Sequence, residues 1–420
     1  MDIVELADRL WRGEASTAQH HPVVFTSELV EVTDGVAFLP AFANCTALRT
    51  EDGLVMVDTG SPLSAHAVHT QIRAWSRSPL HTAIFSHGHI DHVFGVGAFD
   101  EENEAAQRQR VRVLAHEHLP ARFERYVLTA GYNEVVNRRQ FGVDNLIWPR
   151  EYRFPDETYR DEHHVEVGGL ALQLRHEKGE TDDATVTWIP QRGVLCTGDL
   201  FIWSSPNAGN PQKVQRYPAE WAAALRRMAE LNAEMLLPGH GLPVIGPARV
   251  AQALVETAEY LESLVAQTLA LMNAGARLSE ILETVRAPAH LADRAFLQPV
   301  YDEPEFIVHN IWRLYGGWWD GNPASLKPAP ERVLAAEVAA LAGGARRLAA
   351  RAEELAGEGT DEALRVAGHL IELAWLDSPG DAGVAGARAA IFAQRANLAS
   401  STMAKGVFNW AARESTGSRF

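Results

Sequence analysis

The stretch from Leu80 to Phe99, LHTAIFSHGHIDHVFGVGAF, constrains the fold of this chain more than any other segment. Its apolar run from Thr82 to Phe85 predicts a buried β-strand. Three histidines and an aspartate follow within six residues: His87, His89, Asp91 and His92. A strand, a polar turn and then a helix is typical of α/β proteins, which place their chemistry at the carboxyl ends of strands.

The spacing of these polar side chains suits metal binding. Residues two apart in an extended turn point the same way, so His87 and His89 can hold one ion. Asp91 and His92 lie past the bend and can face a second ion. Imidazole and carboxylate ligands suit zinc, iron or manganese rather than calcium. A polar surface turn is the simpler alternative, but four such residues directly after a buried strand favour a metal site.

Two other histidine positions offer candidate ligands. His116 and His118 follow a separate predicted strand, Val111 to Ala115, without a nearby acidic pattern, and we expect them at the surface or rim. In the segment HEKGET, both His176 and Glu180 are possible ligands on residue type alone.

Composition limits the class of protein. A chain of 420 residues can form two domains, and its net charge of −16 argues against nucleic acid or an anionic membrane as the main partner. Cys45 and Cys196 lie in apolar runs and are expected to be buried reduced thiols. The first residues have no apolar core of a signal peptide, and no apolar run is long enough to span a bilayer. We therefore expect a cytoplasmic protein.

The chain changes character near Gly246. Up to that point, short strands alternate with helices, beginning with consecutive antiparallel strands over residues 23–58. Beyond it, alanine- and leucine-rich helical patterns dominate, with Gly and Pro at the breaks. We predict an α/β domain over residues 1–247 and an all-α helical domain over residues 248–420.

The HxHxDH pattern resembles the metallo-β-lactamase superfamily. Four further landmarks of that superfamily have counterparts here in the same order: GLVMVDTG with Asp58, HEKGET, VLCTGD with Asp199, and MLLPGH with His240. The resemblance implies an αββα sandwich for the first domain. Asp58 is expected to orient a metal-bound imidazole rather than to bind metal.

The helical part resembles one branch of that superfamily. WRLYGGWWDGNPASL, Trp312 to Leu326, is similar to a signature of the dimerisation domain of zinc-dependent alkyl sulfatases, and NRRQFG, Asn137 to Gly142, is similar to a motif beside their active site. This implies a homodimer formed through the helical domain. Alkyl sulfatases normally carry a further lipid-carrier-like domain at the C-terminus, which we do not expect in this chain.

The resemblance also implies a binuclear site with two divalent ions, zinc being the first choice. His87, His89 and Glu180 would hold one ion, Asp91, His92 and His240 the other, and Asp199 would bridge them. Glu180 is preferred over His176 because alkyl sulfatases use a glutamate there. Alkyl sulfatases usually have a glutamate at the position of Asp199, and in this respect the chain is more similar to the wider superfamily. Asp91 and Asp199 are the residues expected to be catalytic.

The expected reaction is hydrolysis of an alkyl or related sulfate ester. Candidate substrate-binding residues are cations, an amide and aromatic side chains: Asn137, Arg138, Arg139, Phe141, Trp148, Trp203 and Arg216. The cations of NRRQFG could equally stabilise a helix C-terminus. Two alternatives stay open: the same site could cleave a lactone, amide, phosphoester or other ester, or the chain could be a non-catalytic protein that binds a partner.

Overall fold

The computed structural model describes residues 2–23 and 28–417. Part of the first predicted strand, residues 24–27, lies outside the described residues. Two compact units are present: Met1–Ala130, Pro149–Ala276 and Glu280–Gly317 form the first, and Gly131–Trp148, Arg277–Ser279 and Trp318–Phe420 form the second. The boundaries of these units differ from the predicted domain boundary at residue 247. Residues 248–276 and 280–317 belong to the first unit.

The first unit contains a seven-stranded sheet in the order β1-β2-β3-β4-β5-β6-β7. The first four strands pair antiparallel, and β4 to β7 run parallel. The strands are β1 (Val30–Thr33), β2 (Val36–Leu39), β3 (Cys45–Thr50), β4 (Gly53–Val57), β5 (Leu80–Ile84), β6 (Arg112–His116) and β7 (Glu157–Tyr159).

A second, six-stranded sheet has the order β13-β12-β11-β10-β9-β8. Its pairs are antiparallel except β11 with β12, which run parallel. The strands are β8 (Glu162–Val167), β9 (Leu170–His176), β10 (Thr185–Ile189), β11 (Val194–Ile202), β12 (Met235–His240) and β13 (Val244–Ile245). The predicted turn at Gly168-Gly169 joins β8 to β9.

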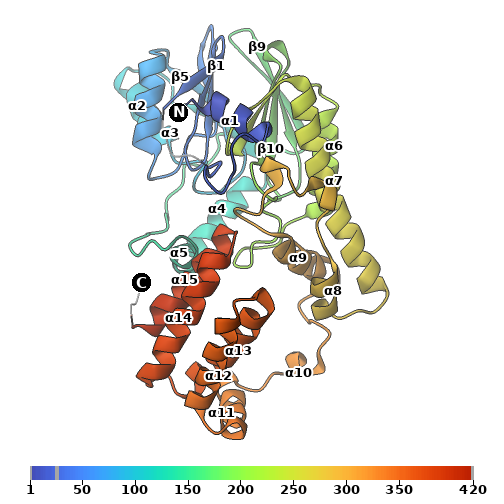
Figure 1. The fold of residues 1–420 in the computed structure, drawn as a ribbon. Helices are drawn as coiled ribbons and strands as arrows, with labels where there is room; N and C mark the ends of the chain where they lie inside the picture. Colours follow the sequence, from blue (N-terminus) through green and yellow to red (C-terminus); the bar gives the residue numbers. More distant parts are fainter. Residues whose placement is uncertain (1, 24–27, 418–420) are drawn as a thin grey trace. The chain divides into compact units, whose positions relative to one another are not determined.

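Alternating side chains of β4 show how the sheets are layered. Val55 and Val57 pack into the core shared with the second sheet, whereas Leu54 and Met56 face the other way, into a core with helices α2 and α3. Figure 1 shows α2 (Ala65–Trp75) and α3 (Val96–Ala105) beside the sheet that carries β5, and α6 (Pro218–Ala229) and α7 (Pro247–Asn273) along the sheet that carries β9 and β10. The first unit is therefore the expected αββα sandwich.

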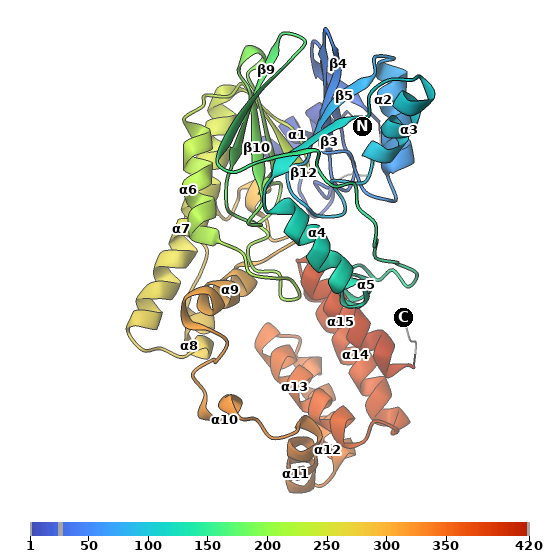
Figure 2. The same ribbon diagram turned by 180° about the vertical axis from the view of Figure 1, so that it is seen from behind.

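The remaining helices of the first unit are α1 (Ile3–Trp11), α4 (Leu119–Leu128) and α9 (Pro304–Gly316). The first helix beyond residue 247, α7, packs against both α6 and α9, as both views show (Figure 2). Short 3₁₀ turns lie at Pro190–Arg192, Ala289–Leu291 and Ala295–Leu297. Helix α8 (Leu278–Thr284) spans the point at which the chain passes between the units.

The second unit is helical, as expected. Its helices are α5 (Ala130–Phe141), α10 (Pro323–Leu326), α11 (Glu331–Ala342), α12 (Ala345–Glu358), α13 (Asp361–Asp377), α14 (Ala382–Leu398) and α15 (Thr402–Ser415). Gly343 takes a φ of 87° and ends α11, because glycine adopts this left-handed conformation without strain, in agreement with the glycines expected at the helix breaks. No helix built from described residues is both long and apolar enough to cross a bilayer.

Candidate metal centre

The predicted ligands other than Glu180 lie in or directly after strands of both sheets, and Glu180 lies between β9 and β10. His87, His89, Asp91 and His92 follow β5, and His240 ends β12. Asp199 lies in β11, at the point where its pairing with β12 shifts register. Glycine allows this close approach: a Cβ at Gly239 would lie 2.2 Å from Asp199 Oδ1. The strand ends thus bring residues far apart in the sequence to one place.

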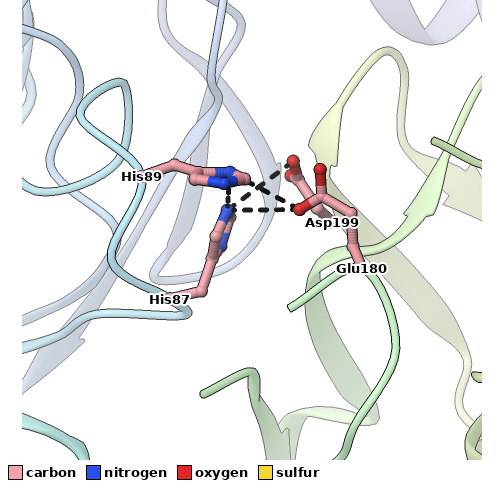
Figure 3. A group of neighbouring side chains, drawn as sticks. All are labelled: His87, His89, Glu180 and Asp199. Atoms are coloured by element: carbon pink, nitrogen blue, oxygen red, sulfur yellow. Dashed lines mark hydrogen bonds and ion pairs between the residues drawn. The ribbon is translucent and has the colours of Figure 1, made fainter. Parts of the chain in front are cut away.

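These side chains form two groups whose ligand atoms lie within 4.8 Å of one another. The first contains His87, His89, Glu180 and Asp199, and the second contains Asp91, His92 and His240. Figure 3 shows the two histidines of the first group facing the carboxylates of Glu180 and Asp199. All seven residues predicted as ligands are therefore placed in one of the two groups.

Asp199 touches both groups. Its Oδ2 atom lies 3.7 Å from His87 Nε2 and 3.2 Å from His240 Nε2, and its Oδ1 atom lies 3.4 Å from His92 Nε2. Ligand atoms about 2.0–2.1 Å from one ion at tetrahedral angles lie about 3.3 Å apart. These separations therefore match those of ligands arranged around shared ions, and the carboxylate of Asp199 lies close to both groups.

Buried polar atoms without a hydrogen bond mark the centre. His92 Nε2, Glu180 Oε2 and Asp199 Oδ1 are such atoms in the part of the chain that the structure describes. An unsatisfied buried polar atom costs about 1–3 kcal/mol, so three of them among the two ligand groups need a compensating partner. Divalent cations that accept nitrogen and carboxylate oxygen fit this donor set.

Neighbouring groups hold the imidazoles in the orientation that metal binding needs. The Nδ1 atom of His92 lies 2.7 Å from Asp58 Oδ2, and the Nδ1 atom of His240 bonds to the Phe42 carbonyl oxygen. Asp58 also accepts hydrogen bonds from the backbone N–H and the hydroxyl of Ser86, both at 2.7 Å. The Nε2 atoms of His92 and His240 are thereby left facing the ligand groups, which agrees with the orienting role expected for Asp58.

Replacing Asp58 with asparagine is expected to weaken metal binding about 10–100-fold, because the carboxylate that orients His92 is lost. Asp58 has a φ of 57°, a left-handed conformation that asparagine tolerates, so the backbone should stay in place. Metal affinity can be measured by competition with a chromophoric chelator. Asp34→Asn, at a side chain that is 96% exposed, is the matched control. An unchanged affinity in Asp58→Asn would contradict the orienting role.

Burial and the neighbouring charges shift the pKa values of the histidines in this centre in opposite directions. Burial and the charge of His92 lower the pKa of His87 to about 3. Burial also lowers the pKa of His92, but Asp58 and the other nearby carboxylates outweigh it and raise this pKa to about 10. For His240, burial is likewise outweighed, chiefly by Asp199, and the pKa rises to about 8. Without metal, the second group therefore carries protonated histidines at neutral pH.

Metal affinity of the second group is expected to rise with pH. Imidazole must be neutral to bind a metal, so binding at neutral pH must displace protons from His240 and His92. Each displaced proton contributes up to about tenfold in affinity per pH unit, until the pH passes the pKa of that group. Titration calorimetry in two buffers of different ionisation enthalpy measures the protons released. Binding that releases no proton near pH 7 would contradict these pKa shifts.

Glu180 and His176, both possible on sequence, occupy different places. Glu180 is 1% exposed, and its Oε2 atom lies 3.6 Å from His87 Nε2 and 3.5 Å from His89 Nδ1. His176 instead stacks on His116 with ring centroids 3.7 Å apart, and its Nε2 bonds to the Asp182 carbonyl oxygen. His116 itself is buried rather than at the surface, 1% exposed, because it packs between His176 and Tyr159.

Two of the predicted substrate residues have other contacts. Trp203 is 1% exposed, and its indole N–H donates to the Leu242 carbonyl at 2.6 Å. The structure thus places Trp203 in the core, because the indole has a buried partner there, and a substrate role for it is not supported. Arg216 is also buried, and its NH2 atom lies 3.1 Å from Glu180 Oε1. Arg216 therefore lies beside the metal centre and forms an ion pair with Glu180, one of the predicted metal ligands.

The other substrate candidates lie in the second unit. Asn137, Arg138, Arg139 and Phe141 are on α5, and Trp148 follows it. Within this unit, Arg138 donates through Nε to the Leu146 carbonyl at 3.0 Å, and the guanidinium of Arg139 lies 4.3 Å from the centre of the Trp410 ring. These contacts stabilise α5 in its own unit, and the substrate role stays a prediction.

Sequence reasoning missed three polar side chains near the ligands. Asn207 donates to Glu180 Oε1 at 2.5 Å, and Asp183 accepts from the Gly88 N–H at 3.0 Å, between His87 and His89. Lys213 is half-buried and lies within electrostatic range of Asp91 and Glu180. Each comes from a segment without periodic pattern, and for Asn207 and Lys213 the sequence indicated only a loop rich in Asn, Pro and Gly, Trp203 to Arg216.

Family models match both parts of the chain. Residues 39–240 match the metallo-beta-lactamase superfamily, and residues 277–418 match alkyl sulfatase dimerisation. The chain is 29% identical over 320 residues to a linear primary-alkylsulfatase of Pseudomonas sp. (strain ATCC 19151), covering 71% of this chain and 60% of the relative. It is 24% identical over 374 residues to an alkyl/aryl-sulfatase of Saccharomyces cerevisiae, covering 82% and 56%.

Among solved structures, a stereoselective inverting sec-alkylsulfatase from Pseudomonas sp. is similar in fold, with a TM-score of 0.82 and 22% identity. The match covers 93% of this chain and 66% of that one. The chain thus spans roughly three fifths of the length of the sulfatases it matches. Each of the two predicted parts, a metallo-β-lactamase fold and a helical alkyl-sulfatase-type region, is therefore matched by a family model.

Proposed function

Since the chain joins a metallo-β-lactamase domain to an alkyl sulfatase dimerisation domain and is homologous to alkylsulfatases, we propose that it is a binuclear metal-dependent hydrolase of alkyl or related sulfate esters. The observation that carries the proposal is the position of Asp199. Its carboxylate contacts His87 in one ligand group and His92 and His240 in the other. One side chain thus links two adjacent ion sites.

Substrate would approach from the exposed side of the centre. The side chains of His89, Asp91 and His240 are 17%, 18% and 12% exposed, whereas those of His87 and Glu180 are only 2% exposed. Two divalent ions, zinc in the first instance, would activate water and stabilise the leaving oxyanion. The chain contributes a fixed frame of imidazoles, and the half-buried carboxylate of Asp91 would accept a proton from the attacking water.

Cations near the ligands support an anionic substrate. Burial lowers the pKa of Lys213 to about 8, with a further contribution from Arg216. The charges of the Asp91 and Glu180 carboxylates oppose this shift, so the Lys213 ammonium is within electrostatic range of two predicted ligands. An ammonium is a compact charge suited to a sulfate oxygen.

Replacing Lys213 with methionine is expected to raise KM for alkyl sulfates about tenfold and to weaken inhibition by inorganic sulfate, because one ionic contact of about 1–2 kcal/mol is lost. Metal content should stay at two ions per chain. Lys178→Met, at a lysine that lies over the Tyr217 ring, is a control with the same loss of charge. An unchanged KM would contradict contact between Lys213 and the sulfate group.

A homodimer and a cytoplasmic location form part of the proposal. Trp318 and Trp319, within the segment that resembles the dimerisation signature, are 71% and 40% exposed in the second unit. Exposed tryptophans are favoured at protein interfaces.

The residue at position 199 supports an alternative substrate class, because aspartate is usual in the wider superfamily: a lactone, amide or phosphoester could be cleaved at the same centre.

The test is release of inorganic sulfate from a panel of primary and secondary alkyl sulfates. As-purified, chelator-treated and metal-reconstituted protein are compared, with metal content measured in each sample. We expect release that is lost with the metal and restored with it. Two bound ions per chain with no sulfate release, together with turnover of a lactone or phosphoester, would overturn the sulfatase proposal and favour the alternative. Absence of both metal and turnover would favour the non-catalytic, partner-binding role.

A further inference from the structure

The loop between β11 and α6, residues 203–217, determines how Glu180 presents its carboxylate. Asn207 donates to Glu180 Oε1 at 2.5 Å, and Arg216 lies 3.1 Å from the same oxygen. Arg216 also donates to the Glu180 backbone carbonyl at 2.7 Å. The other oxygen, Oε2, makes no hydrogen bond and faces His87 and His89. The loop therefore occupies one carboxylate oxygen and leaves the other for an ion.

This loop is itself held by a segment almost a hundred residues later in the chain, Gln298 to Asn310. Asp302 Oδ2 accepts from the Gly209 N–H at 2.6 Å. The amide of Asn310 donates to the Arg216 carbonyl at 3.0 Å, and its oxygen accepts from Gln215 Nε2 at 3.0 Å. These bonds reach the loop next to the two residues that bind Glu180.

The contact between loop and segment is close. A Cβ at Gly209 would lie 2.2 Å from the backbone nitrogen of Ile307, so the loop backbone lies directly against α9. No residue larger than glycine fits at this point without moving one of the two. Loop and segment are therefore held in register with each other.

Asp302 is an unusual residue for a packing contact. It is 0% exposed, and its two oxygens accept from the backbone N–H groups of Gly209 and Glu303. Burial raises the pKa of Asp302 to about 8. A buried carboxyl group is costly to desolvate, and only its hydrogen bonds offset that cost. The position of the loop and the burial of Asp302 are thus coupled.

We infer that Asp302 and Asn310 are positioning residues for the metal centre, acting on Glu180 through the loop, Asp302 on the side of Asn207 and Asn310 through Arg216. Both lie beyond the metallo-β-lactamase match and inside the match to alkyl sulfatase dimerisation, yet both belong to the first compact unit. Part of the sequence assigned to dimerisation therefore serves the metal centre of its own chain. This inference rests on the proposed metal centre but not on sulfate as the substrate.

The test measures zinc affinity of the chelator-treated full chain, by competition with a chromophoric chelator, for Asp302→Asn, Asn310→Ala and Asn207→Ala. We expect each variant to weaken one of the two zinc equivalents about 10–100-fold and to leave the other within about threefold. Asp293→Asn, at an exposed aspartate just before the segment, is the control with the same substitution and should bind zinc as the original chain does.

A double variant separates positioning from general destabilisation. If Asp302 acts through Asn207, Asp302→Asn combined with Asn207→Ala should weaken zinc binding no more than Asn207→Ala alone. Additive losses, or equal losses at both zinc equivalents, would overturn the inference. Circular dichroism verifies folding, and Asn310→Ala carries the test if Asp302→Asn does not fold. Zinc binding with these effects but no sulfate release would remove the sulfatase proposal alone.

Discussion

Replacing Asp199 with asparagine is expected to abolish turnover and to reduce bound metal from two ions per chain to one or none. Its carboxylate lies within 3.2–3.7 Å of His87, His92 and His240. Loss of a group that merely orients a ligand costs about 10–100-fold in metal affinity or activity, so loss of a shared ligand should exceed that range. Inductively coupled plasma mass spectrometry measures the metal, and sulfate release measures the turnover.

Asparagine keeps the shape of the side chain, so the test separates charge from packing. In the original protein, the charges of His240, His92 and His87 hold the pKa of Asp199 well below its usual range despite burial. The neutral amide removes this attraction, and some loss of stability in the metal-free chain follows. Asp293→Asn, at an exposed aspartate, controls for the substitution itself. Two bound ions and full activity in Asp199→Asn would exclude the bridging role.

Replacing Glu180 with glutamine is expected to remove one ion per chain and to reduce turnover more than about 100-fold, whereas His176→Gln should keep both ions. Glutamine can still accept from Asn207 and Arg216 through its oxygen, but its amide nitrogen has no lone pair for a metal. Metal content of the two purified variants decides between the two residues, which sequence alone left open.

Glutamine is preferred to alanine at this position for a physical reason. Arg216 is buried, and alanine would leave its N–H group without the acceptor that the amide oxygen of glutamine still provides, at a cost of about 1–3 kcal/mol. His176→Gln removes the stacking on His116, worth about 0.5–1.5 kcal/mol, and the hydrogen bond of the ring to the Asp182 carbonyl oxygen. Loss of metal in His176→Gln, with both ions retained in Glu180→Gln, would show that His176 is the metal ligand and Glu180 is not.

Much of the fold could be predicted because its signals are local. Apolar periodicity predicted strands alternating with helices and then a helical region, the family resemblance implied the αββα arrangement, and both parts are present. Boundaries were less predictable: residues 120–142 form two helices, α4 and α5, that are separated at Thr129. Residues 280–317 were expected in the second domain, but they pack with the first unit through α9 and α7. Helical pattern indicates that a helix forms and not which neighbour covers it.

The sequence by itself determined which residues can bind metal at this centre. His87 to His92 lie in one short stretch, Asp58, Asp199 and His240 each follow an apolar strand-like run, and the resemblance to the superfamily implied that they meet at one centre. Only the tertiary structure decided between Glu180 and His176, placed Trp203 in the core and brought Asp302 to the loop around Asn207. Such contacts join irregular segments far apart in the chain. Their geometry depends on the packing of the whole unit, and no local pattern of residues encodes it.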